Sequence, residues 1–451
     1  MLRKILLHAF ISITSLIGYS QSINDKILNA INQSDWFSLD SIYNSVPKDS
    51  IHPYLEISSR CFLGHQFNRP EVSIPAFQEL FSTQSEYLDL NNFITSAVTF
   101  GKDLSSAGQN EFAASMINQV IGETQQYLDS ASVHNLTLMA NWYSALAAYN
   151  PYQIQFNGDR VGKIPFTIIP FGPKEKGSVL MRLNNSTING MSADIIFDTG
   201  AASNLITPEM AEKFKLTPIE GTKVSVNGIG QNEGYLAIAQ EMQLGDITVK
   251  DVPFTVVSIS SNNSEADQYT DLLSIVIGSD LMLKLKELTI DFLNNNITVP
   301  SQEQSIPVKT DAKPNLCFSP AMNLLCRGTI HNEPMLMFID TGDASFGGLG
   351  KFFFEKNKQY VLDNGVKDTV RTAGIGGVKY FDCYKVPNMK ISLGNQTLAI
   401  PEMVVTTDND AGAGLYEANI GLRTLMLYSF VRFNFVDFVM TTGIPRATKI
   451  K

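Results

Sequence analysis

Histidine is scarce and unevenly placed in this sequence, which has five in 451 residues. Only His331 lies beyond residue 150. The C-terminal two-thirds of the chain therefore lack the residues for a Ser-His or Cys-His nucleophile and for a His-rich metal site. A dinucleotide site is excluded as well, because no strand, GxGxxG and helix follow one another. We expect chemistry that needs neither a metal nor a cofactor.

Basic residues are outnumbered, with 34 Lys and Arg against 44 Asp and Glu and a formal net charge of −10. This balance argues against a nucleic-acid partner, because such proteins need basic patches to neutralise phosphates. No internal apolar run approaches the ~20 residues that span a bilayer, so no integral membrane span is expected. The length suggests about three folded units.

Cysteine is also sparse, and the four residues are Cys61, Cys317, Cys326 and Cys383. Their spacing matches no metal site, and they are too few for a disulfide scaffold. In an exported chain, Cys317 and Cys326 could close a short loop. Buried free thiols are an equally good interpretation.

The first twenty residues have the pattern of an export signal. Two basic residues stand near the start, mostly apolar residues run to Ile17, and the small residues Gly18 and Ser20 precede a cleavage point. A membrane anchor is the alternative, but the segment is short and no cationic stop follows it. We expect a signal peptide at residues 1–20 and a periplasmic or secreted protein.

Residues 21–150 are expected to form an α-helical domain. Apolar residues recur near helical spacing at 77–90 and 109–128. In the first stretch, Phe77, Phe81 and Leu88 are expected on one face. Three prolines are expected to separate helices: Pro53, Pro70 and Pro75.

From residue 151 onward, short β-rich runs alternate with turns, and the chain repeats itself. The first copy, expected at 151–305, has its landmarks at 195–200, 228–230, 244–246, 275–278 and 288–292. The second copy, expected at 306–451, has them at 337–342, 374–377, 393–395, 419–422 and 431–435. Five similar landmarks in the same order predict a duplicated β lobe.

Each copy contains Asp-Thr-Gly directly after three bulky apolar residues. The motif residues are Asp198, Thr199 and Gly200 in the first copy and Asp340, Thr341 and Gly342 in the second. A buried strand would carry each aspartate to the molecular centre, and glycine permits the tight turn that follows. The threonine hydroxyls could bond backbone across the lobe interface. Two facing carboxylates can share one proton, so one can take a proton from water while the other donates to a peptide carbonyl.

These motifs resemble those of aspartic proteases of the pepsin and retropepsin clan, over roughly residues 160–445. The Asp-Thr-Gly-Ala at 198–201 is closer to retropepsins than to pepsin. The resemblance implies that Asp198 and Asp340 form a catalytic dyad between two β lobes and cleave a peptide or protein in extended conformation. Retropepsins need a dimer to assemble two half-sites. This chain carries both, so a monomer suffices.

The glycine-rich loops resemble the flap tips that close over substrate in this clan. Their residues are Gly228, Ile229 and Gly230 in the first copy and Gly374, Ile375, Gly376 and Gly377 in the second. Pepsins carry a tyrosine on one flap, and either Tyr235, five residues past Gly230, or Tyr380, four past Gly376, could take that position. Ordinary hairpin turns are the alternative interpretation of both loops.

Two departures from the clan's pattern bear on acidity. Ala201 removes a hydroxyl that could bond the first carboxylate, and Asp343 puts a third carboxylate near the dyad. Both changes should raise the dyad's pKa values. We expect activity at mildly acidic to neutral pH.

The sequence thus predicts an exported aspartic endopeptidase that is mainly β, bilobal and pepsin-like, with an α-helical N-terminal domain. That domain could be a pro-segment, a module that docks a protein partner, or a structural brace. Pro-segments of this clan are usually shorter than the ~130 residues here, which favours docking or bracing. The alternative for the whole chain is an inactive peptide-binding or scaffolding protein on the same fold.

Overall fold

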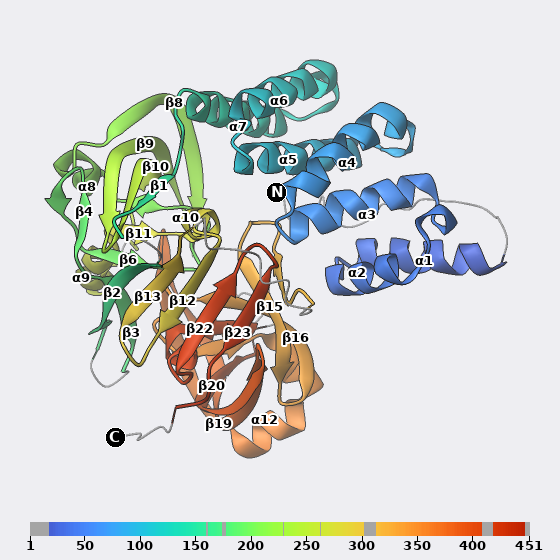
Figure 1. Cartoon of the computed structure of the whole chain (residues 1–451). Helices are drawn as coiled ribbons and strands as arrows, with labels where there is room; N and C mark the ends of the chain where they lie inside the picture. The colour runs from blue at the N-terminus through green and yellow to red at the C-terminus, as the bar shows by residue number, and fades with distance from the viewer. Residues whose placement is uncertain are drawn as a thin grey trace. The chain divides into compact units, whose positions relative to one another are not determined.

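The computed structural model describes residues 18–158, 161–173, 177–228, 230–261, 263–301, 313–407 and 418–446. The chain divides into two compact units, Met1–Asn150 and Pro151–Lys451. Helices make up the first unit and strands dominate the second (Figure 1). The expected fold class, mainly β with an α-helical N-terminal domain, is confirmed. Most of the expected export signal, residues 1–17, lies outside the described residues.

The first unit is a series of helices in which each packs against its neighbours in sequence (Figure 1). They are α1 (Gly18–Asn32), α2 (Trp36–Ser45), α3 (Pro53–Gln66), α4 (Pro70–Thr83), α5 (Leu90–Ser106), α6 (Asn110–Thr124) and α7 (Ser130–Ala147). The carboxylates of Asp35, Asp89 and Asp129 cap α2, α5 and α7 by accepting a backbone N–H of the first turn. Pro53 and Pro70 begin α3 and α4, where a missing N–H costs nothing.

Pro75 does not separate helices, contrary to the expectation from sequence. It lies inside α4, which ends only at Thr83. Phe77 is fully buried on this helix and stacks on Phe100, and this packing outweighs the cost of a proline inside a helix. Leu88, expected on the same face, lies beyond the end of α4.

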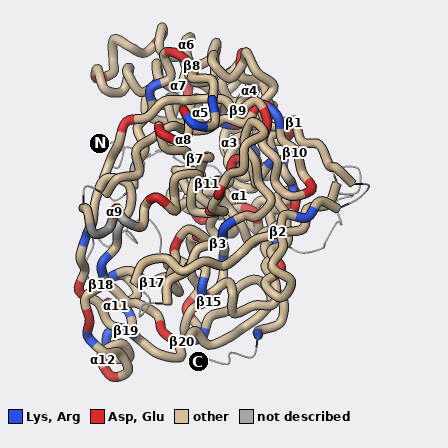
Figure 2. Tube along the Cα trace, turned by 90° about the vertical axis from the view of Figure 1, so that its left-hand side faces the viewer, with Lys and Arg blue, Asp and Glu red and all other residues tan. Residues whose placement is uncertain are grey.

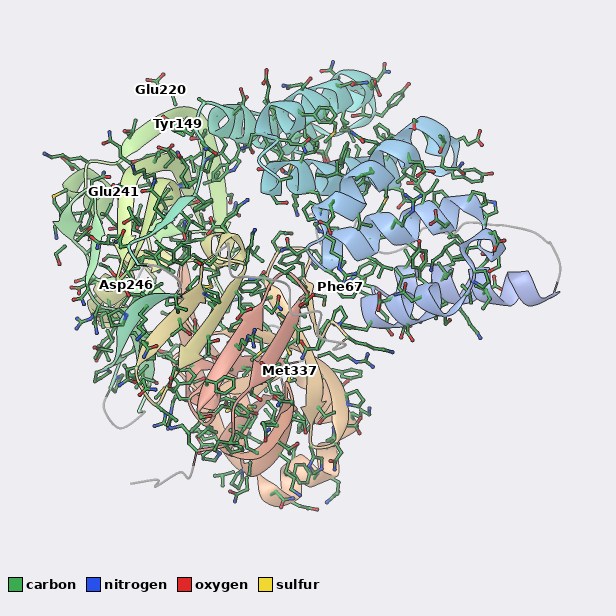
Figure 3. All side chains as sticks on the ribbon, viewed as in Figure 1. Phe67, Tyr149, Glu220, Glu241, Asp246 and Met337 are labelled. Carbon is green, nitrogen blue, oxygen red and sulfur yellow. The ribbon has the colours of Figure 1, made fainter. Side chains whose placement is uncertain are left out.

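The second unit begins with the elements of the first copy. They are β1 (Gln153–Phe156), β2 (Val161–Pro170), β3 (Val179–Leu183), β4 (Ser186–Ile188), β5 (Met191–Ser192), β6 (Ile195–Phe197), β7 (Leu205–Ile206), α8 (Pro208–Lys213), β8 (Thr217–Asn227), β9 (Gln231–Leu244), β10 (Ile247–Val257), α9 (Ser264–Thr270), β11 (Ile275–Ile277), α10 (Ser279–Lys284), β12 (Glu287–Asp291) and β13 (Asn296–Pro300). Glu241 and Asp246, labelled in Figure 3, mark the β9–β10 hairpin.

The second copy follows with a comparable series. Its elements are β14 (Leu316–Phe318), β15 (Leu324–Ile330), β16 (Glu333–Asp340), β17 (Gly347–Leu349), α11 (Lys351–Lys356), α12 (Lys358–Asn364), β18 (Val366–Gly374), β19 (Gly377–Leu393), β20 (Gln396–Thr406), β21 (Ala418–Gly421), α13 (Leu422–Leu425), β22 (Phe430–Asn434) and β23 (Val439–Thr442). Met337, labelled in Figure 3, is a fully buried residue of β16.

The two copies share the strand pairing around each Asp-Thr-Gly. In the first copy β6 pairs in parallel with β11, which is antiparallel to β7, which is parallel to β10. In the second copy β16, β21, β17 and β20 pair in the same order and directions. The duplication predicted from five short landmarks is therefore also a duplication of topology.

The closing strands of the two copies join the lobes. β12 pairs antiparallel with β22, with Leu288 opposite Phe433 and Ile290 opposite Val431. All four side chains are buried. The red strands β22 and β23 consequently lie beside β12 and β13 in Figure 1 and extend the sheet of the first copy. The two lobes are therefore joined by backbone pairing as well as by the chain that links them.

Three general properties bear on the sequence expectations. All four cysteines are buried and carry free thiols, so the free-thiol interpretation fits and the disulfide one does not. Within the described ranges, no helix is long and apolar enough to cross a membrane. Acidic and basic positions are interspersed along the drawn trace (Figure 2).

Candidate active site

Buried strands deliver both motif aspartates to the interface between the two copies. Asp198 follows β6, whose three residues are all buried, and Asp340 is the last residue of β16. The N–H of Asp198 donates to the carbonyl of Ile277 on β11, at 3.0 Å. The apolar runs of the sequence are thus the inner strands of each lobe, and the polar motif begins where each strand ends.

The two threonines lock the loops to each other. The N–H of Thr199 donates to the Thr341 hydroxyl at 2.9 Å, and the N–H of Thr341 donates to the Thr199 hydroxyl at 3.0 Å. Each hydroxyl in turn donates to a carbonyl of the opposite copy, that of Ile339 or that of Phe197. Both threonines are fully buried, so all four bonds are shielded from water. This is the cross-lobe bonding that the sequence suggested.

Each glycine of the motif faces the carboxyl group of the opposite copy. A Cβ on Gly200 would collide with the Asp340 carboxyl, and one on Gly342 would collide with that of Asp198. The N–H of Gly200 donates to Asp198 Oδ1 at 2.7 Å, and the N–H of Gly342 donates to Asp340 Oδ1 at 2.9 Å. Only glycine at these two positions lets each loop approach the carboxyl of the opposite copy so closely.

Burial and mutual charge set the acidity of the pair. Desolvation raises the pKa of Asp198, although hydrogen bonds from Gly200 and Ala201 act in the opposite direction. Desolvation also raises the pKa of Asp340 well above its usual range, and the charges of Asp198 and Asp343 raise it further. Two buried carboxyls this close do not both ionise readily, so the pair shares one proton up to a higher pH than an isolated aspartate would hold it.

The surroundings of the two aspartates differ between the copies. Asp343 accepts a hydrogen bond from the N–H of Ser345 at 2.8 Å and another from Asn419 Nδ2 at 2.7 Å. In the first copy, Ala201 takes the place of Asp343 and Val276 that of Asn419, and Ala201 packs against an apolar cluster that contains Val276. One side of the dyad is therefore lined by a third carboxylate and the other by hydrocarbon.

The two predicted flaps are β-hairpins that meet at their tips. In the second copy Gly374 and Gly377 are paired across the β18–β19 turn, with Gly376 at φ +77°. The N–H of Gly230, from the β8–β9 hairpin, donates to the carbonyl of Ile375 at 2.9 Å. A Cβ on Gly228 would press on that same carbonyl. Ile229 lies outside the described residues.

Tyr235 is not placed at the dyad by any hydrogen bond among the described residues. It lies on β9 opposite Lys223 and Val256, and 36% of it is exposed. Tyr380, on the other hairpin, is 63% exposed. Neither ring has a contact that marks it as the aromatic residue of a pepsin flap.

Several supporting residues carry no signal that sequence reasoning could use. Asn323 Nδ2 donates to the carbonyl of Gly200 at 2.9 Å from the opposite copy. Asn204 and Asn419 bond beside the motif loops from positions without a motif of their own. Within the described residues, no group of three or more His, Cys, Asp or Glu is arranged to hold a metal ion.

Comparison with known proteins supports the class of site that this geometry defines. Residues 185–281 match a family model described as aspartyl protease. The matched segment contains Asp198 and the first hairpin but ends before Asp340, which is linked to it by the repeat and by the threonine bonds. No curated protein and no solved structure matches the chain. Residues 185–281 thus resemble an aspartyl protease domain, and this match supports hydrolysis of proteins as the general activity.

Proposed function

We propose that the protein is an exported aspartic endopeptidase in which Asp198 and Asp340 act together on a bound water molecule. The observation that carries the proposal is the pair of Asp-Thr-Gly loops, locked by reciprocal threonine bonds, with each glycine against the opposite carboxyl. A turn aspartate that merely capped its own loop would not need this cross-lobe arrangement. The aspartyl protease match over 185–281 adds independent support.

The acidity of the pair suggests how the work is divided. Ionised Asp198 takes a proton from water, whose oxygen attacks the peptide carbonyl carbon, while protonated Asp340 donates its proton to the carbonyl oxygen. The tetrahedral intermediate collapses when the proton now on Asp198 passes to the peptide nitrogen and the C–N bond breaks. Asp340 recovers a proton from the intermediate. No covalent bond to the enzyme forms.

The hairpins support an extended peptide as substrate. Their tips are bonded through Gly230 and Ile375, so entry requires that this bond open and closure would exclude bulk water. Strand edges on both hairpins offer backbone groups to an extended chain. Because one chain supplies both aspartates, we propose a monomer. Export rests on the pattern of residues 1–20, and N-terminal sequencing of the mature protein would test it.

The decisive experiment digests a mixed peptide library between pH 3 and pH 8 with the parent protein, Asp198→Asn and Asp340→Asn. The matched control is Asp194→Asn, since the Asp194 carboxylate is 84% exposed and lies just before β6. Cleavage by the parent and the control, absent in both dyad variants and blocked by a statine-type inhibitor, is the expected result.

Two other results would change the conclusion. Cleavage that persists in either dyad variant would rule out the paired-aspartate mechanism. No cleavage by a folded parent, with peptides nevertheless retained by it, would favour the peptide-binding alternative on the same fold.

A further inference from the structure

Tyr152 is the second residue of the β-rich unit and is held in an unusual conformation. Its φ is +63°, a left-handed value that a bulky residue adopts only where its surroundings hold it. Its N–H donates to the carbonyl of Asp251 at 3.3 Å. Its hydroxyl donates to Asp280 Oδ2 and accepts from Asn204 Nδ2 at 3.1 Å. One side chain thus bridges two polar residues more than fifty positions away along the chain.

Asn204 is fully buried and connects three parts of the first copy. Its Nδ2 donates to the carbonyl of Pro253 at 3.0 Å, and its Oδ1 accepts from the N–H of Gly278 at 3.0 Å. Its carbonyl accepts from the N–H of Thr255 at 2.9 Å. Every polar group of this amide is therefore used to fix the end of the loop that begins at Asp198.

Asp280 completes the network at the start of α10. Its Oδ1 accepts from the N–H of Leu281 at 2.7 Å. Burial raises the pKa of Asp280 to about 6, and Lys284 is the cation that faces it. A carboxylate that is costly to bury is kept here beside a tyrosine hydroxyl, which is a placement that hydrogen bonding has to stabilise.

The network supports the Asp198 loop from beneath. The N–H of Ser279 donates to the carbonyl of Ala201 at 2.8 Å, and Gly278 lies so close to Ser203 that a Cβ would collide with its carbonyl. The preceding residue, Ile277, accepts the N–H of Asp198 itself. Displacing α10 would therefore displace the loop that holds the first carboxylate.

The second copy supports its loop with a different set of side chains. The residue at the place of Asn204 is Phe346, whose carbonyl accepts the N–H of Gly421 at 3.2 Å and the hydroxyl of Thr424 at 2.6 Å. The place of Asp280 is taken by Arg423, which stacks on the Phe346 ring. The carboxylate of Asp343 and the hydroxyl of Thr424 bond within the second loop, whereas beside the first loop Asn204 and Asp280 both bond the Tyr152 hydroxyl.

We propose that Tyr152 is a positioning residue that orients the Asp198 loop through Asn204 and Asp280. This inference deepens the proposed function and rests on it for its kinetic consequence. Tyr152 follows directly on the segment that leaves α7, the last helix of the helical unit. A residue next to the junction between the two units therefore helps to hold one catalytic loop in place.

The test compares the parent with Tyr152→Phe, which removes only the hydroxyl, and with Asp280→Ala. Tyr149→Phe is the matched control, because Tyr149 lies just before the junction (Figure 3) and its hydroxyl forms no hydrogen bond with any described residue. Amide hydrogen exchange should accelerate at least fivefold at 199–207 and 275–284 in both variants. Exchange at 337–345, in the second copy, should not change.

Kinetics give a second readout on the full-length protein. Tyr152→Phe should lower kcat about tenfold with KM within twofold, because the residue touches no substrate. Combining Tyr152→Phe with Asp280→Ala should lower kcat no further than the more severe single change does, since both changes break one network. Unchanged exchange at 199–207 in Tyr152→Phe would overturn the inference whether or not the protein is a protease. An inactive parent with the expected exchange pattern would instead remove only the proposed function.

Discussion

Thr199 and Thr341 each donate a backbone N–H to the hydroxyl of the other, and both are fully buried. The relationship is reciprocal, so neither loop reaches its conformation alone. The two carboxyls face each other because this exchange fixes the loops that carry them. The consequences for stability and for activity are therefore expected to appear together.

Thr199→Val should destabilise the protein and abolish cleavage. Valine keeps the shape but leaves the N–H of Thr341 and the carbonyl of Ile339 without their buried partner, at a cost of about 1–3 kcal/mol for each unsatisfied group. Thr199→Ser keeps the hydroxyl and should retain most stability and activity. Denaturant unfolding and peptide cleavage measure the two effects. A valine variant as stable and active as the serine variant would contradict this account.

Most of the arrangement of the two Asp-Thr-Gly loops can be predicted from the sequence, because the motif is local and occurs twice in one chain. The apolar run before each Asp-Thr-Gly predicts a buried strand, and the order of landmarks predicts the duplication. What sequence could not supply is the partner of a polar residue that has no motif. Tyr152 and Asp280 are 128 positions apart in the sequence and meet only in the folded protein.

Pro75 shows that a local sequence signal can be overridden by packing elsewhere in the fold. Its local preference correctly signals a cost inside a helix, but the burial of Phe77 decides the outcome from contacts with α5. A flap tyrosine stays a prediction, because spacing from the glycine-rich loops is the one signal that the sequence offers for Tyr235 or Tyr380. Position along a strand does not determine whether a ring reaches the dyad, and the Tyr235 ring is part exposed on β9.

Asp343→Asn should move the alkaline limb of the kcat/KM profile to lower pH. The charge of Asp343 helps to raise the pKa of Asp340, so removing that charge lets Asp340 lose its proton more easily. Asparagine can still pair with Asn419, whose Oδ1 has no partner among the described residues. Ala201→Ser, at the equivalent place in the first copy, is the comparison. An alkaline limb that moves to higher pH in Asp343→Asn would refute the role of its charge.

Gly230→Ala should separate the hairpin tips. The added Cβ would collide with the carbonyl of Gly376, so the bond from the Gly230 N–H to Ile375 could not persist. We expect a raised KM and faster hydrogen exchange at both tips, with the unfolding midpoint little changed. Gly158→Ala is the control, because nothing lies within 4 Å of its added carbon. Equal KM values for the two variants would show that tip contact is not needed for binding.

Asp340→Asn should make stability less dependent on pH. The pKa of Asp340 is raised on folding by burial and by neighbouring carboxylates, so the folded protein binds this proton more tightly than the unfolded chain. That stabilisation is fully present below the unfolded pKa of about 3.9 and is lost as pH rises through the folded value. The parent should therefore lose more stability than the variant between acidic and neutral pH.

Urea unfolding at several pH values would measure this difference, with Asp194→Asn as the exposed control. Subtracting the parent curve from each variant curve removes the contribution of carboxylates that do not interact with the substituted residue. A difference curve for Asp340→Asn that is flat from acid to neutral pH would mean that folding does not raise the pKa of Asp340.

The last prediction concerns a polar network inside the helical unit. Asp103 of α5 contacts His65 Nδ1 at 2.7 Å through Oδ1 and accepts from the Ser73 hydroxyl at 2.6 Å through Oδ2. All three residues are buried, and they come from three different helices. Asp103→Ala would strand two buried polar groups and should cost about 3–5 kcal/mol, as breaking a buried pair does.

The control for this change lies on the same helix. Asp89 caps α5 from an exposed position, and Asp89→Ala should cost only about 1 kcal/mol. Hydrogen exchange on the full-length chain should show faster opening of 53–106 in Asp103→Ala than in Asp89→Ala. Because the helical unit is compact by itself, exchange at 195–200 and 337–342 should stay at the parent rate in both. Equal protection of 53–106 in the two variants would mean that packing of the apolar faces, and not Asp103, holds these helices together.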